Sequence, residues 1–317
     1  MIFNKIAVIP NEKKDPLLKN TKNVINYFIE RNARNTQKSN KSNKSDKCVI
    51  YADKSYEEKI GINDFNFRES VNYVPEDDLY KICNLLIVLG GDGTILKVAS
   101  KASVCDIPII GINLGRIGFM SGIEADETDL FENLFSGNYK TEKRMMIDVE
   151  IIKAGGDNNI NNIIEYAGSA LNDAVITNGG ATPKLIELDL MCDNIKITHY
   201  RADGVIIATP TGSTAYSMSA GGPVIDPNTE CFCVTPVCPH SFINRPIIFS
   251  HGSVLEMKNK NADNANYDIY LTIDGQTNIK LGENDTVRIK KSGFTTKLIA
   301  IKKHGFFDVI RKKISEN

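Results

Sequence analysis

The stretch Leu85-Leu86-Ile87-Val88-Leu89-Gly90-Gly91-Asp92-Gly93-Thr94 decides the fold of the first half of the chain. Its five consecutive apolar residues predict a strand that is buried on both faces, as in a parallel sheet. The glycine-rich turn that follows predicts a passage from strand to helix, with Thr94 capping a helix that begins at Ile95. In an open α/β sheet, such a turn lies at the carboxyl edge of the strands, where ligands bind.

The turn also has the composition of a phosphate-handling site. Gly90, Gly91 and Gly93 lack side chains, so their backbone N–H groups can approach phosphate oxygens closely. The carboxylate of Asp92 can bind Mg²⁺ or accept a proton from an attacking hydroxyl group. A tight turn in which Asp92 is only a cap is the alternative interpretation. The chain contains no GK[ST] loop and no GxGxxG motif, which argues against a P-loop NTPase and an ordinary dinucleotide dehydrogenase.

Around this turn, short apolar runs alternate with helical patterns over the first 125 residues. Further strands are predicted at Ile6–Ile9, Cys48–Ala52 and Ile107–Ile112, and helices around Val24 and Phe28 and over Thr94–Ala102. The alternation predicts a Rossmann-like α/β domain over residues 1–130. Asn35–Lys47 is rich in Asn, Lys and Ser, and predicts a flexible loop between the first helix and the second strand.

The second half of the chain has a different hydrophobic period. Lys184–Met191 and Tyr267–Asp274 alternate apolar and polar residues, and turn-rich spacers such as Ala154–Asn162 and Asn259–Asn266 separate such runs. This pattern predicts an antiparallel, sandwich-like all-β domain over residues 131–294. A basic, helix-like tail over about 295–317 could return to either domain, packing back onto the α/β domain or staying with the β domain, and the active site is expected between the two domains.

A hydroxyl-rich segment follows Arg201 and Asp203. Six Ser and Thr hydroxyls fall within the eleven positions of Thr209–Ser219, together with the single tyrosine Tyr216. Such a segment offers hydrogen bonds and close backbone approach to a polar ligand, with Tyr216 as a stacking ring. Upstream, Asn172 and Asp173 place an amide beside a carboxylate, and either can bind a ribose diol. An Asn-Asp pair is also a favoured turn dipeptide.

Composition excludes several classes of function. With 38 basic and 39 acidic residues, the net charge of −1 supplies no field that would recruit nucleic acid or a membrane surface. No apolar run approaches the roughly 18 residues that span a bilayer. Seven cysteines without a CxxC pair, and four scattered histidines, predict buried reduced thiols in a cytoplasmic protein and no zinc site.

Taken in order, these segments resemble the bacterial NAD kinase family. The resemblance rests on Gly90–Thr94, Gly111–Phe119, Asn172-Asp173, Asp203–Pro227 and Thr235–Ser241 with Arg245-Pro246, and it spans residues 82–275. The glycine turn alone is shared with diacylglycerol and other lipid kinases and with phosphofructokinases. Met218 and Met120 stand where family members usually have leucine, and both changes conserve volume.

The resemblance implies a role for each matching residue. Asp92 would activate the 2′-hydroxyl of the adenosine ribose of NAD, and Gly90, Gly91, Gly93 and Thr94 would hold the donor phosphates. Lys97 would lie near the phosphates, Phe119 at the adenine, and Asn172 and Asp173 at the nicotinamide ribose. The remaining NAD-binding residues would be Gly93, Arg201, Asp203, Thr214, Ala215, Tyr216, Ser217, Met218, Ser219 and Gln276.

The resemblance further implies ATP as donor, Mg²⁺ carried by the nucleotide with Asp92 as its one candidate protein ligand, and a homotetramer or a dimer with the same interface. Two other functions stay open at this point. A lipid kinase would share the turn but would need an apolar acyl pocket, which the polar Thr211–Ser219 segment argues against. A catalytically silent dinucleotide sensor would use the same pocket for binding alone.

Overall fold

The computed structural model describes residues 3–38, 47–61, 65–154, 163–179, 184–240, 245–261, 268–302 and 305–315. The chain divides into two compact units: unit 1 is Met1–Lys143 with Thr296–Asn317, and unit 2 is Arg144–Thr295. The C-terminal tail therefore belongs to unit 1. Among the described helices, none combines the length and the apolar character that a membrane crossing requires.

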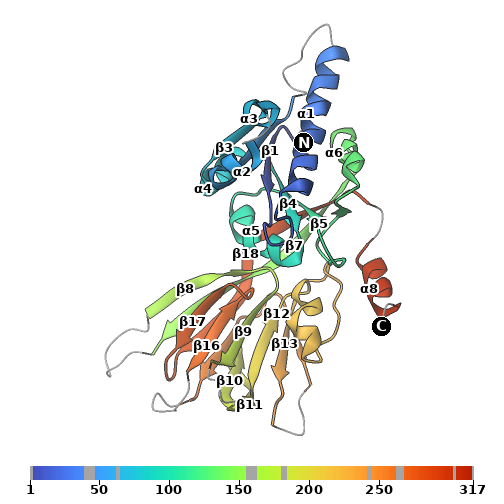
Figure 1. Ribbon diagram of the computed structural model, residues 1–317. Coiled ribbons are helices and arrows are strands. Elements are labelled where there is room, and N and C mark those ends of the chain that lie inside the picture. The colour runs from blue at the N-terminus through green and yellow to red at the C-terminus, as the bar shows by residue number, and fades with distance from the viewer. Residues whose placement is uncertain are drawn as a thin grey trace. The chain divides into compact units, whose positions relative to one another are not determined.

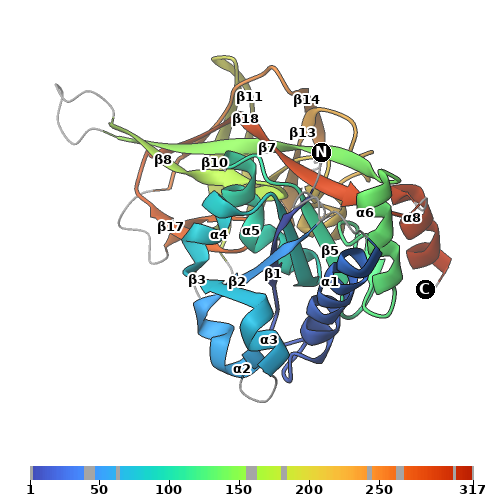
Figure 2. The same ribbon diagram turned by 90° about the horizontal axis from the view of Figure 1, so that it is seen from above.

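Unit 1 contains a parallel sheet with helices on both faces (Figures 1 and 2). Its strands are β1 (Lys5–Ile9), β2 (Val49–Asp53), β3 (Val71–Val74), β4 (Leu85–Gly90), β5 (Ile109–Asn113) and the short β6 (Ile123–Glu124). Its helices are α1 (Lys19–Lys38), α2 (Glu57–Gly61), α3 (Phe65–Ser70), α4 (Glu76–Ile82), α5 (Asp92–Val104), α6 (Glu132–Ser136) and α8 (Phe306–Ser315), with 3₁₀ turns at Lys54–Tyr56 and Thr128–Phe131.

The strand order in unit 1 is β3-β2-β1-β4-β5, and every pair in it is parallel. Alternate residues of β4 face opposite sides of the sheet, and Leu85, Ile87 and Leu89 join one apolar cluster with α1 and α6. On the opposite side, α5 contacts β4 and β5. Both faces of β4 are therefore covered, which confirms the predicted α/β sheet and explains why this strand is apolar at every position.

Unit 2 is an antiparallel β structure built from two sheets. Its strands are β7 (Lys140–Lys153), β8 (Ile163–Ala170), β9 (Asp173–Asn178), β10 (Ile186–Cys192), β11 (Ile195–Ala202), β12 (Gly204–Ala208), β13 (Cys231–Val237), β14 (Ile247–Ser250), β15 (Leu255–Asn259), β16 (Ile269–Ile273), β17 (Thr277–Leu281) and β18 (Thr286–Ala300). A 3₁₀ turn at Gly212–Thr214 leads into the four-residue helix α7 (Tyr216–Ser219).

One sheet of unit 2 has the order β14-β13-β12-β9-β16-β17, and the other contains β11-β10-β15-β18 with β7 and β8. Inward-facing residues of both sheets share one apolar core, for example Leu188 and Leu190 of β10 with Val205 and Ile207 of β12. The all-β expectation is confirmed. Strand β18 extends from unit 2 into unit 1, where Leu298 pairs with Ile109 of β5.

Several local expectations need correction or lie outside the described residues. Asn35–Lys38 forms the last turn of α1 and is not loop, while residues 39–46 of the expected loop are not described. Most of the two expected spacers, 155–162 and 262–266, also lie outside the described residues. All seven cysteines are free thiols, but Cys105 and Cys238 are exposed, against the expectation of burial.

Candidate active site

The turn between β4 and α5 places Asp92 at the start of a helix. Gly91 is the N-cap of α5 with extended backbone (φ −164°, ψ −173°), and Asp92 is the first helical residue. The expectation that Thr94 caps the helix is wrong, because the helix begins two residues before it. The hydroxyl of Thr94 instead accepts a hydrogen bond from Asn11 Nδ2 at 2.8 Å, which ties the loop after β1 to the turn.

The carboxylate of Asp92 is held by backbone groups of a second loop. Its Oδ2 accepts a hydrogen bond from the N–H of Phe119 at 2.8 Å, and its Oδ1 accepts one from the N–H of Met120 at 3.2 Å. Gly118 makes this approach possible, since a Cβ at that position would lie 2.1 Å from Oδ1. A carboxylate has about four acceptor positions. Asp92 is therefore fixed in place and still able to accept a proton.

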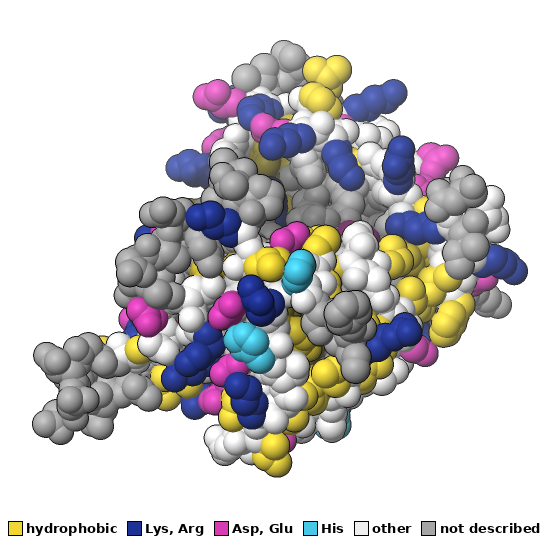
Figure 3. Space-filling model, turned by 90° about the horizontal axis from the view of Figure 1, so that it is seen from below, with side chains coloured by type: hydrophobic (Ala, Val, Ile, Leu, Met, Phe, Trp, Pro, Cys, Tyr) yellow, Lys and Arg dark blue, Asp and Glu magenta, His cyan; other side chains and the backbone are white. Residues whose placement is uncertain are grey.

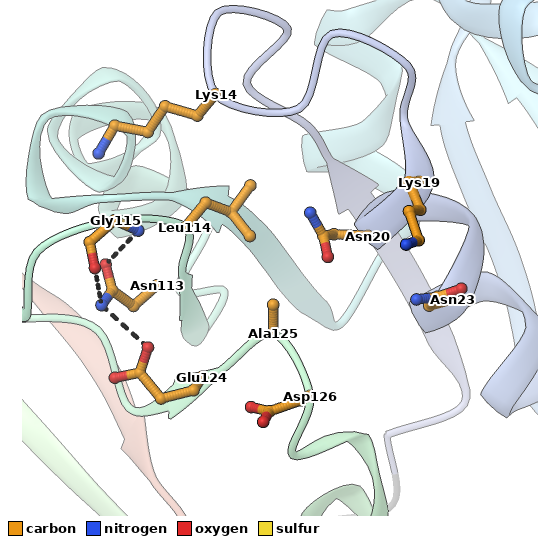
Figure 4. Close-up of a pocket in the computed structure, with 10 residues that line it drawn as sticks. All are labelled: Lys14, Lys19, Asn20, Asn23, Asn113, Leu114, Gly115, Glu124, Ala125 and Asp126. Carbon is orange, nitrogen blue, oxygen red and sulfur yellow. Dashed lines mark hydrogen bonds between the residues drawn. The ribbon is translucent and has the colours of Figure 1, made fainter.

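The loop that holds Asp92 is braced from within by Asn113, the last residue of β5. Its Nδ2 donates to the carbonyl oxygen of Gly115 at 2.9 Å and to Glu124 Oε2 at 3.0 Å, and its Oδ1 accepts from the N–H of Gly115 at 3.2 Å (Figure 4). Asn113 is buried. These bonds fix the path of residues 113–118 and so the position of the donors to Asp92.

The surroundings of the glycines differ in a way that suits an anionic ligand. A Cβ at Gly91 would lie 2.6 Å from Lys14 Nζ, so this ammonium group lies directly over the turn. Apart from its chain neighbours and the backbone of its own helix, a Cβ at Gly93 would meet no atom of the described residues within 4 Å. Among these residues no contact requires glycine at Gly93, and the space beside it would admit a ligand to the first turn of α5, where backbone N–H groups lack helical partners.

Two other predicted residues of unit 1 have neighbours that the sequence did not indicate. Lys97 lines a cavity of about 430 Å³ together with Thr94 of the turn and residues of β1, β2 and α4. The ring of Phe119 lies against α8: its centroid is 5.6 Å from that of Phe306, and Lys313 Nζ lies 4.2 Å from it over the ring face. The C-terminal helix therefore packs on the loop that holds Asp92.

In unit 2, the pair Asn172-Asp173 is organised by Asp274. The carboxylate of Asp274 accepts hydrogen bonds from the N–H groups of Leu171 (2.8 Å), Asn172 (2.7 Å) and Asp173 (3.1 Å). Asp274 reaches them from the turn between β16 and β17, where Asp274 and Gly275 have φ of 49° and 67° and the N–H of Gln276 donates to Ile273 O at 2.9 Å. The side-chain Oδ1 of Asn172 is buried without a hydrogen-bond partner in the described part of the chain.

Burial next to Asp274 changes the acidity of Asp173. Desolvation, and then the charge of Asp274, raise the pKa of Asp173 to about 7. Desolvation also raises the pKa of Asp274, but its three backbone donors oppose that shift. Because these donors favour the charged form of Asp274, the proton that the pair retains near neutral pH resides on Asp173.

The hydroxyl-rich segment divides into internal and exposed members. The hydroxyl of Thr209 donates to Leu171 O, that of Ser213 to Pro210 O at 2.7 Å, and that of Ser217 lies 3.0 Å from Thr235 Oγ1. These three residues are buried, so their side chains stabilise the segment itself. Tyr216 (45% exposed), Met218 (43%) and Ser219 present side chains to solvent, which makes them the members available to a ligand.

The segment packs closely on the Asn172-Asp173 pair. A Cβ at Gly212 would lie 2.1 Å from Asn172 O, and the N–H of Thr209 donates to that same oxygen at 2.8 Å. The exposed polar residues of the segment and the Asn-Asp pair therefore belong to one continuous region of unit 2.

Arg201 and Asp203 lie at the end of β11. Arg201 Nε is 3.2 Å from Glu187 Oε1 on β10, in a row of alternating charges that continues with His199, Asp189 and Lys196. Figure 3 shows basic, acidic and histidine side chains lying among one another on one face of the molecule. Asp203 is half-buried, and its N–H donates to Val237 O at 3.0 Å. The charge of Arg201 is thus already balanced by a carboxylate.

Four residues with defined roles in this geometry were not singled out from the sequence. They are Lys14 over the glycine turn, Asn113 and Gly118 in the loop behind Asp92, and Asp274 behind the Asn-Asp pair. Asn113 and Gly118 fall inside the quoted run Gly111–Phe119, and Asp274 lies two residues before Gln276. The sequence around these residues does not reveal their partners.

Comparisons with known proteins assign the chain to a family. Residues 7–139 match the family model of the ATP-NAD kinase N-terminal domain, and residues 171–301 match that of the ATP-NAD kinase C-terminal domain. The NAD kinase of Thermoanaerobacter sp. (strain X514) is 36% identical over 315 residues, covering 99% of this chain and 100% of the relative. The chain belongs to the NAD kinase family.

Further NAD kinases and solved structures agree with this membership. The NAD kinase of Natranaerobius thermophilus is 39% identical over 315 residues, covering 99% of this chain and 98% of the relative. A yeast NADH kinase, solved in complex with NADH, superposes with a TM-score of 0.80 at 26% identity, and the match covers 100% of this chain and 89% of the yeast chain. An Archaeoglobus fulgidus NAD kinase in complex with ATP shares the fold, with a TM-score of 0.68 at 23% identity and 99% coverage of both chains.

Membership of the NAD kinase family decides between the functions left open by the sequence. The chain is a phosphotransferase that acts on NAD, and neither a lipid kinase nor a silent dinucleotide sensor is favoured by any of these relatives.

Proposed function

We propose that this NAD kinase transfers the terminal phosphoryl group of ATP to the 2′-hydroxyl of the adenosine ribose of NAD, with Asp92 as the general base. The observation that carries the assignment is the fixed carboxylate of Asp92, held at both oxygens by backbone N–H groups beside a glycine turn. The family description as an ATP-NAD kinase supports ATP as the donor, and the NADH bound to the yeast relative supports a nicotinamide dinucleotide as acceptor.

In the proposed step, the 2′-oxygen forms a bond to the γ-phosphorus while the bond between that phosphorus and the β,γ-bridging oxygen breaks. ADP leaves with the bonding electron pair, and the proton of the 2′-hydroxyl passes to Asp92. Phosphoryl transfer needs positioning and charge neutralisation more than covalent help from the protein. The fixed carboxylate of Asp92 would provide positioning, and Lys14, which lies over Gly91, would contribute to charge neutralisation.

For NAD binding we propose residues at the nicotinamide ribose, a residue at the adenine, and further contacts along the dinucleotide. Asn172 and Asp173 would bind the nicotinamide ribose, because an amide and a carboxylate held side by side suit two neighbouring hydroxyl groups. Phe119 would lie at the adenine, and the remaining contacts would come from Gly93, Lys97, Arg201, Asp203, Thr214, Ala215, Tyr216, Ser217, Met218, Ser219 and Gln276. Of these, Ser217 would act through its backbone, since its hydroxyl already pairs with Thr235.

The donor phosphates would be bound at Gly90, Gly91, Gly93 and Thr94. Mg²⁺ would accompany them, and it would supply positive charge that offsets the negative charge of the phosphates. In the described residues no three potential metal-binding side chains of His, Cys, Asp or Glu gather at one place. A magnesium ion that keeps several waters and binds mainly to phosphates fits these surroundings, with Asp92 as its candidate carboxylate ligand.

We further propose a cytoplasmic homo-oligomer, a tetramer or a dimer that shares its interface. Seven free thiols, two of them exposed, suit a reducing compartment. In such an assembly, residues of unit 1 and unit 2 that act on one NAD can come from different copies of the chain.

The direct test of the function is a coupled assay for NADP. Purified protein is incubated with NAD, ATP and Mg²⁺, and NADP is detected with an NADP-specific dehydrogenase; a parallel reaction contains NADH. We expect NADP to accumulate with both ATP and Mg²⁺ present. Thermal stabilisation by NAD without product formation would identify a binding protein instead.

The raised pKa of Asp173 predicts that NAD binding depends on pH. Between pH 6 and 8 the carboxyl group loses its proton and becomes a better acceptor for ribose hydroxyls, so KM for NAD is expected to fall as pH rises through about 7. Asp173→Asn is expected to remove this dependence. Steady-state kinetics at fixed ATP across this range measures it.

Loss of the Asp173 proton, which is expected to favour NAD binding, is expected to lower the stability of the fold. A carboxyl group whose pKa is higher in the folded protein than in the unfolded chain stabilises the fold fully at low pH, and this contribution is lost as pH rises through the folded pKa. The melting temperature without NAD should therefore fall from pH 5 to 8 more in the wild type than in Asp173→Asn. Parallel curves for the two proteins would show that Asp173 does not titrate in this range.

A further inference from the structure

Basic side chains that form no ion pair in the described residues lie near the loop behind Asp92. Lys14 Nζ lies over Gly91 and would be 3.5 Å from a Cβ at Gly115. Beyond Gly115, a cavity of about 720 Å³ is lined by Arg116, Lys312 and Lys313 together with Asn113, Ile117 and Glu124. Lys14 lines a neighbouring cavity of about 510 Å³, which shares Asn113, Gly115 and Glu124 with the first. Figure 4 shows Lys14 extending from the loop after β1 above Gly115.

These four side chains differ from other basic residues nearby. In the part of the chain that the structure describes, Lys14, Arg116, Lys312 and Lys313 form no ion pair with a carboxylate, whereas Arg311 on the same helix lies 3.3 Å from Asp308 and Lys302 pairs with Glu127. Two carboxylates line these cavities: Glu124 lines both and accepts a hydrogen bond from Asn113, and Asp126 lines the one beside Lys14. They stand against five basic side chains, because Lys19 also lines the cavity beside Lys14. The two cavities, which share lining residues, thus carry an excess of positive charge in a protein whose net charge is −1.

The excess charge is placed by packing. Helix α8 is anchored to the Asp92 loop, because Phe306 packs on Phe119 and Lys313 covers the face of the same ring. The N–H of Phe119 in turn donates to Asp92. A concave region lined by cations concentrates anions, and guanidinium and ammonium groups are the side chains that bind phosphate oxygens.

We propose that Lys14, Arg116, Lys312 and Lys313 bind the linear phosphate chain of the donor, so that α8 supplies half of the positive charge of the donor site. The inference rests on the proposed function, since it places the non-transferred phosphates on the path from the glycine turn along residues 113–118. The ligand class is a linear anion of three or more phosphates, which a nucleoside triphosphate or inorganic polyphosphate can supply.

The test uses the full chain and a variant with Arg116→Gln, Lys312→Gln and Lys313→Gln. Its matched control is Arg311→Gln, which removes one charge from the same helix at an exposed, ion-paired position. We expect KM for ATP to rise about tenfold or more in the triple variant, KM for NAD to change less than about twofold, and the salt dependence of KM for ATP to become weaker. The control should match the wild type in all three.

Binding of inorganic tripolyphosphate, measured by calorimetry, separates the site from catalysis. The wild type should bind it in competition with ATP, and the triple variant should bind it about tenfold more weakly or worse. Donor assays distinguish the two sources of the phosphate chain. If the wild type also uses inorganic polyphosphate as donor and the triple variant does not, the site binds polyphosphates in general. If the wild type uses ATP and not inorganic polyphosphate, the site binds the triphosphate of the nucleotide.

If the wild type forms NADP, and the triple variant has the same KM for ATP and the same affinity for tripolyphosphate, the inference is wrong. The proposed function would then still stand. Absence of NADP formation by the wild type would overturn the proposed function instead. If the triple variant does not fold, Lys312→Gln and Lys14→Met, which lie on different elements, are tested singly and should each raise KM for ATP severalfold.

Discussion

Replacement of Asp92 by asparagine is expected to lower kcat for NADP formation by about 10²–10⁴-fold, the usual contribution of a general base. The amide cannot take up the proton of the 2′-hydroxyl. It also presents an NH₂ group to one of the two backbone N–H groups, of Phe119 and Met120, from which the carboxylate now accepts hydrogen bonds. Because the variant removes no group proposed to bind the nicotinamide ribose, we expect NAD to bind with nearly unchanged affinity.

The experiment pairs single-turnover kinetics with NAD binding measured by calorimetry. Loss of turnover with retained binding separates a role in chemistry from a role in folding. Near-normal NADP formation by Asp92→Asn would show that another group takes the proton, or that none is needed.

The second large effect is expected from Gly118→Ala, a change outside the glycine turn. A Cβ at this position would lie 2.1 Å from Asp92 Oδ1, well inside contact distance, so the carboxylate or the loop must shift. A misplacement of about 1 Å costs about 10² in rate when it affects a reacting group. We therefore expect kcat to fall about 100-fold or more, although the added methyl group is far smaller than any side chain in the site.

Gly293→Ala is the matched control, since a Cβ there meets no atom of the described residues within 4 Å beyond its chain neighbours and the position is exposed. It should leave kcat and the melting temperature almost unchanged. If Gly118→Ala had the same kcat as Gly293→Ala, the close contact with Asp92 could not be part of the working enzyme.

Local patterns allowed the sequence to predict the elements but not all of their ends. The five apolar residues before Gly90 identify a buried strand because both faces of the sheet are covered. Because threonine is a good capping residue, the sequence predicts Thr94 as the helix cap. Gly91, which has no side chain to cap with, takes that position through its extended backbone, and this conformation has no sequence signature of its own.

The site was predictable where its residues form compact motifs and hidden where they are single residues far apart. Lys14 lies in the run Glu12-Lys13-Lys14-Asp15, which is typical of a solvated loop, and only the tertiary fold brings its ammonium group over Gly91. Asp274 acts on Asn172 from a turn 102 positions later. Composition likewise could not tell that Ser213 and Ser217 direct their hydroxyls inward while Tyr216 and Ser219 stay exposed.

The path of β18 has a consequence for how the chain is made. This strand ends beside β5, and Ile299 and the nearby Ile301 complete the apolar cluster to which Ile6, Val24 and Ile87 also belong. A ribosome releases these two isoleucines only after the whole of unit 2 has been synthesised. The N-terminal part of unit 1 thus leaves the ribosome first, but unit 1 is completed last. Until then, strand β5 and the incomplete apolar core remain exposed to chaperones and to other nascent chains.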